Sequence, residues 1–591
     1  MVVRRGGGKP AYIIPHKEGV SQGDPLAMAL YGVALLPLAE GMEKAVPQAV
    51  TPIYADDTSA VGNAVHNAEC MLYLKENGED FGYALEPEKS VHVCRLQDEP
   101  GAKVAFYSRG LRIQFARGKR YLGGFVGSKE FREEWVREKV EKWRDGVCIL
   151  ANIAKRYPQA AYAAFTISYQ NEWAHVQRTV PEVSLLLEPI ERAIRDKFLP
   201  VLLKVDSIGA EMRQLLSHGL KQAGLGVRHP VESADVQFQT SQSACAVLTD
   251  ALFYGTDFDL GEHREAVKQA TTGARDMRVM AEEAFCENRA RKKGTRERWR
   301  LKRAMHTGIW LSCVPSRLNN TEVSQEEWDD NIRLKYNLKP TNMPELCDGC
   351  GCKLTVEHAL ACKRGGLVHL RHNDVADEFE TLAGFAFSPS CVSHEPLIFS
   401  EMTRSRGNNA GNQTQAAAAN VEEASEATRP AEDEDPYVVR SEIRGDKGVH
   451  GFWKRGRTCI FDIRITDTEC QSTRNQDPEK VLAKHELEKK RKYLAACHER
   501  RRDFTPLVYS VDGMASRETK EAEKQLARKL AWKWSREYSE MVGYVRRRMA
   551  LAVVRANSLL LRGSRDRSNR ARPFISDGAA MDAWQQWRER W

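Results

Sequence analysis

Two adjacent carboxylates in Tyr54-Ala55-Asp56-Asp57 follow the apolar run Val50-Thr51-Pro52-Ile53. This order is typical of the tip of a β-hairpin, where paired carboxylates can hold a hard cation such as Mg²⁺. Paired acids are also common on solvated turns, so the upstream sequence decides how informative they are. There, Asp24 before Pro25 predicts a helix start with Asp24 as the N-cap. The mostly apolar segment Leu26 to Leu38 predicts the helix itself.

A helix start followed by a carboxylate hairpin at this distance resembles motifs B and C of the reverse-transcriptase palm. Motif B corresponds to Ser21-Gln22-Gly23-Asp24-Pro25-Leu26, and motif C corresponds to the hairpin. Gly82 to Lys89 (GYALEPEK) is similar to motif D, and Tyr121-Leu122-Gly123-Gly124 is similar to the motif E primer grip.

The resemblance implies an RNA-directed DNA polymerase, with an RNA template and dNTPs as partners. Its implied catalytic, Mg²⁺-binding residues are Asp56 and Asp57, and its implied nucleotide and template contacts are Gln22, Gly23 and Lys89. In that family, motif A precedes motif B and supplies the aspartate that completes the two-metal site. No aspartate precedes Ser21, and two-metal catalysis needs ligands on both sides of the cations. We therefore expect an N-terminally truncated palm and an inactive polymerase in the chain as given.

Composition places the chain among globular proteins. With 591 residues and 42% hydrophobic content, it should form several domains with apolar cores. Its 14 cysteines do not suggest a disulfide scaffold in so long a chain. The start, Met1 to Lys9, lacks the apolar core of a signal peptide, and the longest apolar run, near Met28 to Leu38, is too short to span a bilayer. We expect an intracellular protein without membrane contact, nuclear if its substrate is chromosomal DNA. The oligomeric state stays open.

A helical, charged pattern follows the palm-like motifs, and one part of it is strongly basic. From Arg289 to Arg303 (RARKKGTRERWRLKR), Glu297 is the only acid. Basic side chains neutralise phosphates, and an exposed indole can stack on a base. A solvated helix face is the alternative, although such faces usually mix charges of both signs. We predict nucleic-acid contact by Arg291, Lys292, Lys293, Arg296, Arg298, Trp299 and Arg300.

A cysteine-histidine cluster, Cys347-x2-Cys350-x7-His358-x3-Cys362, follows this helical region. Zn²⁺ takes four such ligands tetrahedrally, and the Cys-x2-Cys step suits a tight turn that presents both thiolates. Cys352 can replace Cys350 in this pattern. A closed set of ligands leaves no position for water, so the sequence predicts a structural zinc site.

The segment before the cluster, from Gly308-Ile309-Trp310-Leu311 to Arg333-Leu334-Lys335-Tyr336, adds a second resemblance. It is similar to the segment before the Cys-Cys-His-Cys motif of non-LTR retrotransposon proteins that carry a restriction-enzyme-like endonuclease. In that class the order is polymerase, zinc motif, nuclease, and the nuclease nicks a DNA target.

The pattern after the cluster predicts an α-β-β-β-α-β order, which matches the PD-(D/E)xK nuclease core. The expected elements are a helix at Asp374 to Leu382, strands at Ser393 to Phe399, Tyr437 to Ile443 and Thr458 to Thr466, a helix at Lys480 to Arg500, a strand at Thr505 to Val511 and a helix at Arg517 to Trp534. A Gly- and Lys-rich turn is expected after Ile443. Residues 403–436 are polar and predict a disordered insertion within this domain.

Period-two alternation in Cys459 to Ile465 places Asp462 on one strand face and apolar residues on the other. Glu442 stands where the nuclease family usually has Pro-Asp, so we expect Glu442 and Asp462 to share Mg²⁺ or Mn²⁺ as catalytic ligands. Arg464 occupies the position of the motif lysine but is too basic to act as a general base. In this class the catalytic lysine often lies on the next helix, where Lys489 and Lys492 are the candidates.

Together these patterns predict a multidomain α/β and α protein. The expected parts are a partial reverse-transcriptase palm with motifs B to E (1–127), a helical thumb and basic connector (128–340), a zinc knuckle (341–366), a PD-(D/E)xK nuclease-like α/β domain (367–515), and C-terminal helices with a basic tail (516–591). One alternative is a catalytically dead nucleic-acid-binding retroelement remnant. An HNH nuclease is less favoured, because Arg371-His372-Asn373 is only a weak echo of its motif.

Overall fold

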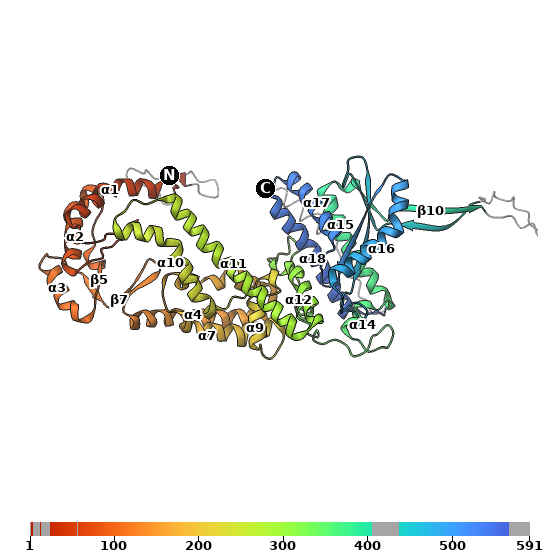
Figure 1. Cartoon of the computed structure of the whole chain (residues 1–591), viewed down its shortest axis with the longest axis horizontal. Helices are drawn as coiled ribbons and strands as arrows, with labels where there is room; N and C mark the ends of the chain where they lie inside the picture. Colours follow the sequence, from red (N-terminus) through yellow and green to blue (C-terminus); the bar gives the residue numbers. More distant parts are fainter. Residues whose placement is uncertain (1, 4–11, 14–23, 56, 405–436, 567–591) are drawn as a thin grey trace, which may run out of the picture. The chain divides into compact units, whose positions relative to one another are not determined.

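The computed structural model describes residues 2–3, 12–13, 24–55, 57–404 and 437–566. It is mostly helical with several small sheets, as expected for a multidomain α/β and α chain (Figure 1). Contacts divide the chain into two compact units. The first unit is Met1–Val147, Gln170–Ala193 and His229–Val279, and the second is Cys148–Tyr169, Ile194–Arg228 and Met280–Trp591. Most of the insertion expected at 403–436 lies outside the described residues.

The first unit begins with the helix and hairpin that the sequence predicts, except that the N-cap of the helix is Leu26 and not Asp24. Helix α1 (Ala27–Ala45) starts after a turn in which Asp24 Oδ1 accepts the backbone N–H of Leu26 at 2.8 Å. Leu38 and Met42 of α1 are buried in a cluster with Leu74. The following elements are β3 (Ile53–Tyr54), β4 (Asp57–Thr58), α2 (Ala64–Asn77), β5 (Val91–Val93), α3 (Glu99–Tyr107), β6 (Gln114–Ala116), β7 (Gly118–Tyr121) and β8 (Gly124–Gly127). Strands β3 and β4 pair antiparallel, which confirms the predicted hairpin.

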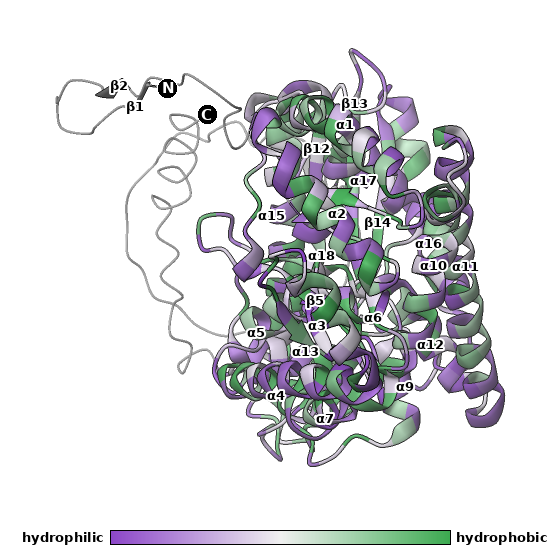
Figure 2. Cartoon of the chain, turned by 90° about the vertical axis from the view of Figure 1, so that its left-hand side faces the viewer, coloured by the Kyte–Doolittle hydropathy of each residue, from purple (hydrophilic) through white to green (hydrophobic). Residues whose placement is uncertain are grey.

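Amphipathic helices make up most of the middle of the chain. Hydrophilic and hydrophobic residues alternate along them (Figure 2), as expected for helices that bury one face. In the second unit, Trp328 is fully buried and its indole N–H donates to Leu202 O at 3.1 Å. The helices are α4 (Lys129–Ala154), α5 (Pro158–Ile167), α6 (Ala174–Thr179), α7 (Glu188–Ala193), α8 (Leu199–Leu203), α9 (Ala210–Ser217), α10 (Pro230–Tyr254), α11 (Leu260–Lys293), α12 (Thr295–Thr307), α13 (Gln325–Lys335) and α14 (Val356–Ala361). Across the described ranges, no helix has both the length and the apolar character that crossing a membrane requires.

The C-terminal part of the second unit is an α/β layer structure. A sheet of order β14-β13-β12-β9 has a parallel β13–β14 pair and antiparallel pairs elsewhere. Strands β10 (Leu397–Arg404) and β11 (Tyr437–Arg444) pair with each other as a separate antiparallel ribbon. The remaining elements are α15 (Leu367–Ala386), β9 (Val392–His394), β12 (Lys447–His450), β13 (Thr458–Thr466), α16 (Pro478–Glu499), β14 (Asp503–Ser510), α17 (Arg517–Trp534) and α18 (Tyr538–Arg562).

The two faces of β13 pack against different layers. Phe461 and Ile463 lie in a core with Phe379 of α15 and Leu526 of α17. On the opposite face, Ile460 packs with Tyr493 and Cys497 of α16. The predicted alternation along β13 is therefore confirmed. It leaves Asp462 on the face that α16 covers.

The predicted Gly- and Lys-rich turn is only partly correct: residues 451–457 form a turn, but Lys447–His450 before them form strand β12. Its Gly448 is needed, since a Cβ there would lie 2.4 Å from Ser393 Oγ on β9. Its Lys447 is buried because the ammonium is paired with the carboxylates of Asp377 and Glu380. As a result, β12 and not β11 is the strand that pairs with β13.

Candidate metal centres

The four predicted zinc ligands converge. Cys347 Sγ and Cys362 Sγ are 3.9 Å apart, and Cys350 Sγ is 3.3 Å from His358 Nε2. All four ligand atoms lie within 4.8 Å of one another. These separations suit a tetrahedral ion with bonds of about 2.0–2.3 Å. Cys352 is not one of the four converging ligands. Its carbonyl accepts the N–H of Cys347 at 2.8 Å, and its backbone and its thiol hydrogen-bond with the Cys350 thiol.

Local structure prepares the Cys347 thiol for a metal. Burial by itself raises the pKa of Cys347, but hydrogen bonds from the backbone at Gly349 and from His358 outweigh it and bring the pKa to about 6. A thiol that ionises near neutral pH is ready to bind zinc, since the thiolate is the ligand. His358 is held on α14, where Thr355 Oγ1 accepts its backbone N–H at 3.1 Å.

The cluster is locked to the end of α18. Arg565 donates to the carbonyls of Ala359 and Leu560, each at 2.9 Å. Asp348 accepts the backbone N–H of Arg565 at 2.8 Å. Leu561 is buried in the same apolar cluster as the ligands Cys347 and Cys362. We therefore expect the folded state of the Cys/His segment and that of the end of α18 to depend on each other.

A second centre lies where β12 begins beside β13. Asp462 is 4% exposed, and Asp446 immediately precedes β12, facing the middle of β13. Asp446 Oδ2 accepts the backbone N–H of Ile463, and Asp446 N–H donates to Phe461 O at 2.9 Å. Through these contacts Asp446 is bonded to Phe461 and Ile463, the two residues that flank Asp462 in the adjacent strand β13. The two carboxylates are therefore neighbours in space.

The pKa values of the two carboxyl groups are shifted in opposite directions. Burial raises the pKa of Asp462, and the nearby Asp446 raises it further. Burial also raises the pKa of Asp446, but hydrogen bonds from His372 and from the Ile463 backbone outweigh it and hold the pKa below its usual value. Neighbouring carboxyl groups whose pKa values are shifted in opposite directions are typical of functional sites.

Of the two candidate lysines, only Lys489 contacts a candidate carboxylate. Its ammonium forms an ion pair with Asp462 Oδ2 from helix α16. The ammonium of Lys492 lies over the ring of Tyr493, 4.7 Å from its centroid. Arg464, at the motif-lysine position, donates to Glu488 at 2.8 Å. Lys489 is therefore the better candidate for a cation beside a phosphate.

The expectation that Glu442 shares a metal with Asp462 is wrong. Glu442 is exposed on the separate β10–β11 ribbon, and its Oε2 accepts from Arg444 at 2.7 Å. Asp446 takes the expected place instead. The signal for it was Gly445-Asp446 directly before a short strand, which sequence reasoning treated as part of a turn.

The palm-like motifs lie together in the first unit. Tyr83 of the motif D segment donates to Thr58 Oγ1 at 3.0 Å, and Ser59 Oγ donates to the hydroxyl of Tyr121 at 2.5 Å. Tyr121 ends strand β7 of the β7–β8 hairpin, which carries the motif E segment. The carboxylate hairpin is thus in contact with both following motifs.

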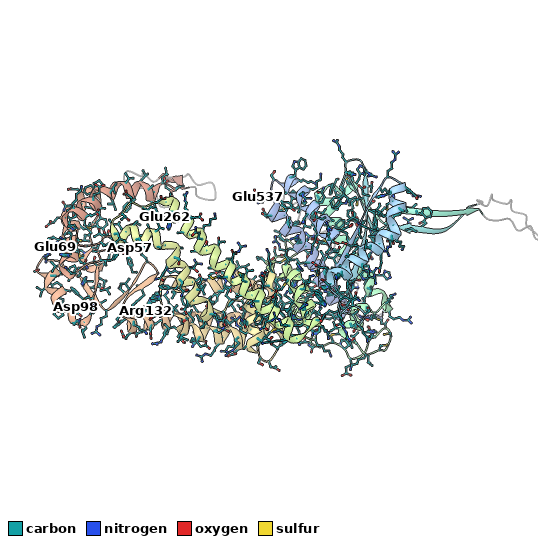
Figure 3. All side chains as sticks on the ribbon, in the orientation of Figure 1. Asp57, Glu69, Asp98, Arg132, Glu262 and Glu537 are labelled. Atoms are coloured by element: carbon teal, nitrogen blue, oxygen red, sulfur yellow. The ribbon has the colours of Figure 1, made fainter. Side chains whose placement is uncertain are left out.

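The structure describes two of the candidate polymerase residues, Asp57 and Lys89. Asp57 is exposed on β4 (Figure 3). Lys89 is exposed and pairs with Glu86 at 3.4 Å. The remaining candidates lie outside the described residues, namely Asp56, Gln22 and Gly23.

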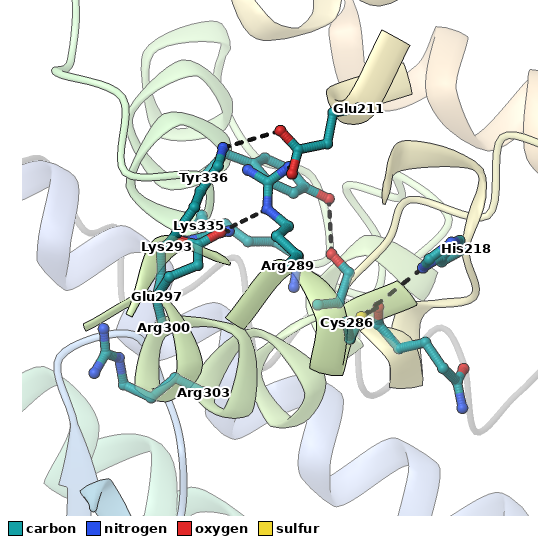
Figure 4. A network of polar contacts seen from close by, with 12 residues as sticks. Glu211, His218, Cys286, Arg289, Lys293, Glu297, Arg300, Arg303, Lys335 and Tyr336 are labelled. Carbon is teal, nitrogen blue, oxygen red and sulfur yellow. Dashed lines mark hydrogen bonds and ion pairs between the residues drawn. The ribbon is translucent and has the colours of Figure 1, made fainter. Parts of the chain in front are cut away.

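Part of the predicted basic surface faces inward (Figure 4). Arg300 is 6% exposed, pairs with Glu297 at 2.7 Å and donates to Lys335 O at 3.0 Å. Glu297 also accepts from Arg289. Burial raises the pKa of Glu297, yet the two arginines outweigh it and lower the pKa to about 2. The assignment of Arg300 to nucleic-acid contact is wrong, because its charge is already neutralised inside the fold.

The rest of the basic segment is more accessible. Trp299 is half-buried and its indole N–H donates to Asn475 O at 3.2 Å. Lys293 is exposed but pairs with Glu211 at 3.1 Å. The other exposed candidates are Arg291, Lys292, Arg296 and Arg298. These side chains stay candidates for contact with phosphates.

Arg298→Ala and Arg300→Ala are expected to distinguish an exposed arginine that binds phosphate from a buried arginine that stabilises the fold. Arg298→Ala should weaken binding to a short DNA duplex and lower the slope of log K against log salt by about one, with little change in stability. Arg300→Ala leaves the half-buried Glu297 with Arg289 as its remaining arginine partner and should cost about 2 kcal/mol of unfolding free energy. Salt-dependent binding titrations and urea unfolding measure both. An Arg300→Ala protein of wild-type stability would contradict the structural role.

Comparison with known proteins adds no relative. No protein-family model matches the chain, and no curated protein matches its sequence.

Proposed function

We propose that the C-terminal α/β part of this chain is a metal-dependent endonuclease of the PD-(D/E)xK type, which nicks duplex DNA. The observation that carries the proposal is the convergence of Asp446, Asp462 and Lys489, two carboxylates at adjacent strands and a lysine from the covering helix. The order of a Cys/His cluster before this part also agrees with the retrotransposon proteins that the sequence resembles.

The donor set fits a divalent cation such as Mg²⁺ or Mn²⁺. Asp462 Oδ2 is buried, and its one polar contact among the described residues is the ammonium of Lys489. Asp446 and Asp462 would hold such a cation, which would supply Lewis-acid activation of water and of a phosphodiester. Lys489 would then stabilise negative charge on the phosphate. The apolar packing of β13 against α16 holds this lysine in position.

The first unit supports a further, related proposal. Contacts of the carboxylate hairpin with Tyr83 and Tyr121 favour a reverse-transcriptase palm, in which Asp57 would bind Mg²⁺. With the nuclease and the zinc knuckle, this would make the chain part of a retrotransposon protein that acts on a DNA target and an RNA template in the nucleus. A catalytically dead retroelement remnant that only binds nucleic acid is the alternative.

A nicking assay on supercoiled plasmid tests the nuclease. The full chain should convert supercoiled to open-circular DNA with Mg²⁺ or Mn²⁺, and a chelator should stop it. Asp462→Asn should abolish nicking, because it removes a metal-binding charge while keeping the side-chain shape. DNA binding should persist, since Asp462 contacts no phosphate in this assignment. Unaltered nicking by Asp462→Asn would reject the site. No nicking with salt-dependent binding would favour the remnant.

A further inference from the structure

Two connections that are far apart in the sequence lie side by side at one end of the sheet β14-β13-β12-β9. Residues 451–457 lead into β13, and residues 500–502 lead into β14. Because β13 and β14 are parallel, both connections enter the sheet at the same end. Arg457 joins them, since its Nε donates to Arg501 O at 3.2 Å and its Nη1 pairs with Asp503 Oδ1 at 3.2 Å. The nuclease assignment made above uses neither connection.

This end of the sheet carries cations that the fold leaves without partners. In the two connections and the residues that flank them, the acids are Glu499 and Asp503, and Asp503 is already paired with Arg457. The exposed basic side chains that form no ion pair or hydrogen bond with another described residue are those of Lys454, Arg455, Arg500 and Arg501. These four residues form the basic edge.

The backbone holds the basic edge in place. Gly451 N–H donates to Arg457 O at 2.7 Å, and the indole N–H of Trp453 donates to Thr505 Oγ1 of β14 at 2.9 Å. Arg501 has a φ of +54°, a left-handed backbone conformation that usually belongs to glycine after the end of a helix. A long cationic side chain at a position that favours glycine points to a role for that side chain.

The basic edge stands at the end of the strand that carries Asp462. Strand β13 begins at Thr458, four residues before Asp462. A strand rises about 3.3 Å per residue, so Asp462 is about 13 Å from the first residue of β13. This distance corresponds to about four base-pair steps of duplex DNA. A duplex with one phosphate at Asp462 is therefore long enough to reach the basic edge.

We propose that the basic edge binds the phosphate backbone of duplex DNA and holds the substrate across the proposed nuclease site. Lysine and arginine side chains without protein partners neutralise phosphates and release counterions. They come from two turns along an edge, so they suit the repeated charges of a duplex better than a single small anion. Phosphate contacts carry no sequence information, so this binding should not depend on base sequence. The use of the bound DNA rests on the proposed nuclease function, but binding can be measured without cleavage.

Salt-dependent binding of the full chain to a short DNA duplex, with no Mg²⁺ or Mn²⁺ added, tests the proposal. Two double variants neutralise one turn each, namely Lys454→Gln with Arg455→Gln, and Arg500→Gln with Arg501→Gln. Each should lower the slope of log K against log salt by about two, because two phosphate contacts are lost. Each should also weaken binding by about tenfold or more near physiological salt.

Two further proteins show whether charge at the basic edge is responsible. Lys454→Arg with Arg455→Lys keeps both charges and should keep the slope. Lys155→Gln with Lys339→Gln removes two exposed charges elsewhere in the same unit and should bind DNA as the wild type does. A slope that is unchanged in both neutralised doubles, or lowered equally in this control, would overturn the proposal. Loss of binding to vesicles containing phosphatidylserine, with DNA binding unchanged, would assign the basic edge to a lipid surface and overturn it as well.

Nicking kinetics distinguish this proposal from the nuclease proposal. In protein that nicks plasmid, the neutralised doubles should raise KM by about tenfold with a smaller effect on kcat, because the basic edge is remote from the reacting phosphate. If the wild type nicks DNA and binding does not depend on the basic edge, the edge assignment is wrong and the nuclease stands. If binding depends on the basic edge in protein that never nicks, the edge assignment stands and the nuclease proposal fails.

Discussion

Asp446→Asn is expected to stop metal-dependent nicking, whereas Glu442→Gln is expected to leave it within about twofold. Asp446 is fixed beside Asp462 by the backbone of β13, and its Oδ1 lies 3.2 Å from His372 Nε2 at the half-buried edge of the site. Glu442 is exposed and paired with Arg444. Losing an outer-shell partner of a metal site costs about 10- to 100-fold, so losing a ligand should cost more than about a hundredfold.

Plasmid nicking at equal protein concentration measures both variants, with duplex binding followed in parallel. The pair is matched, because each change replaces a carboxylate by its amide. Both proteins should bind DNA, since neither position is assigned a phosphate contact. A nick rate that falls with Glu442→Gln and not with Asp446→Asn would restore the assignment made from sequence and reject the structural one.

The sequence predicted well those elements whose periodicity reflects their burial. Helix α17 has the predicted bounds, Arg517–Trp534, because apolar residues recur on its core-facing side. The cysteine and histidine spacing predicted the convergence of Cys347, Cys350, His358 and Cys362 because all four come from one short segment. Asp462 was found because a lone acid in an apolar strand needs a partner, and that partner is Lys489.

What the sequence missed depends on contacts between distant segments. Asp446 stands in a stretch of Gly, Asp and Lys that has the composition of a turn. Tertiary contacts override that propensity, since Lys447 is neutralised by two acids from α15. Arg300 was assigned to the surface because its neighbours in sequence are basic. Its partners include Lys335, from a helix far along the chain. Such pairings are not visible in local patterns.

Cys362→Ala is expected to release zinc and to loosen the end of α18. Full ligand sets in zinc-finger peptides bind with about 10–16 kcal/mol of apparent free energy near neutral pH, and much of it is lost with one thiolate. Cys362 is 8% exposed and shares its apolar cluster with Leu561 of α18. Arg565 bonds the knuckle through Ala359. Loss of the ion should therefore disorder both segments together.

Elemental analysis and amide hydrogen exchange measure this result. Wild-type protein prepared without chelator should hold about one zinc per chain at this cluster, and Cys362→Ala should hold less. Exchange should rise at 347–362 and at the end of α18, with the core of β13 and β14 unchanged. Cys352→Ala is the control, because the Cys352 thiol neighbours Cys350 but is not one of the four converging ligand atoms. If Cys352→Ala loses zinc and Cys362→Ala keeps it, then the ligand set is wrong, because only a group built on Cys352 would respond in that way.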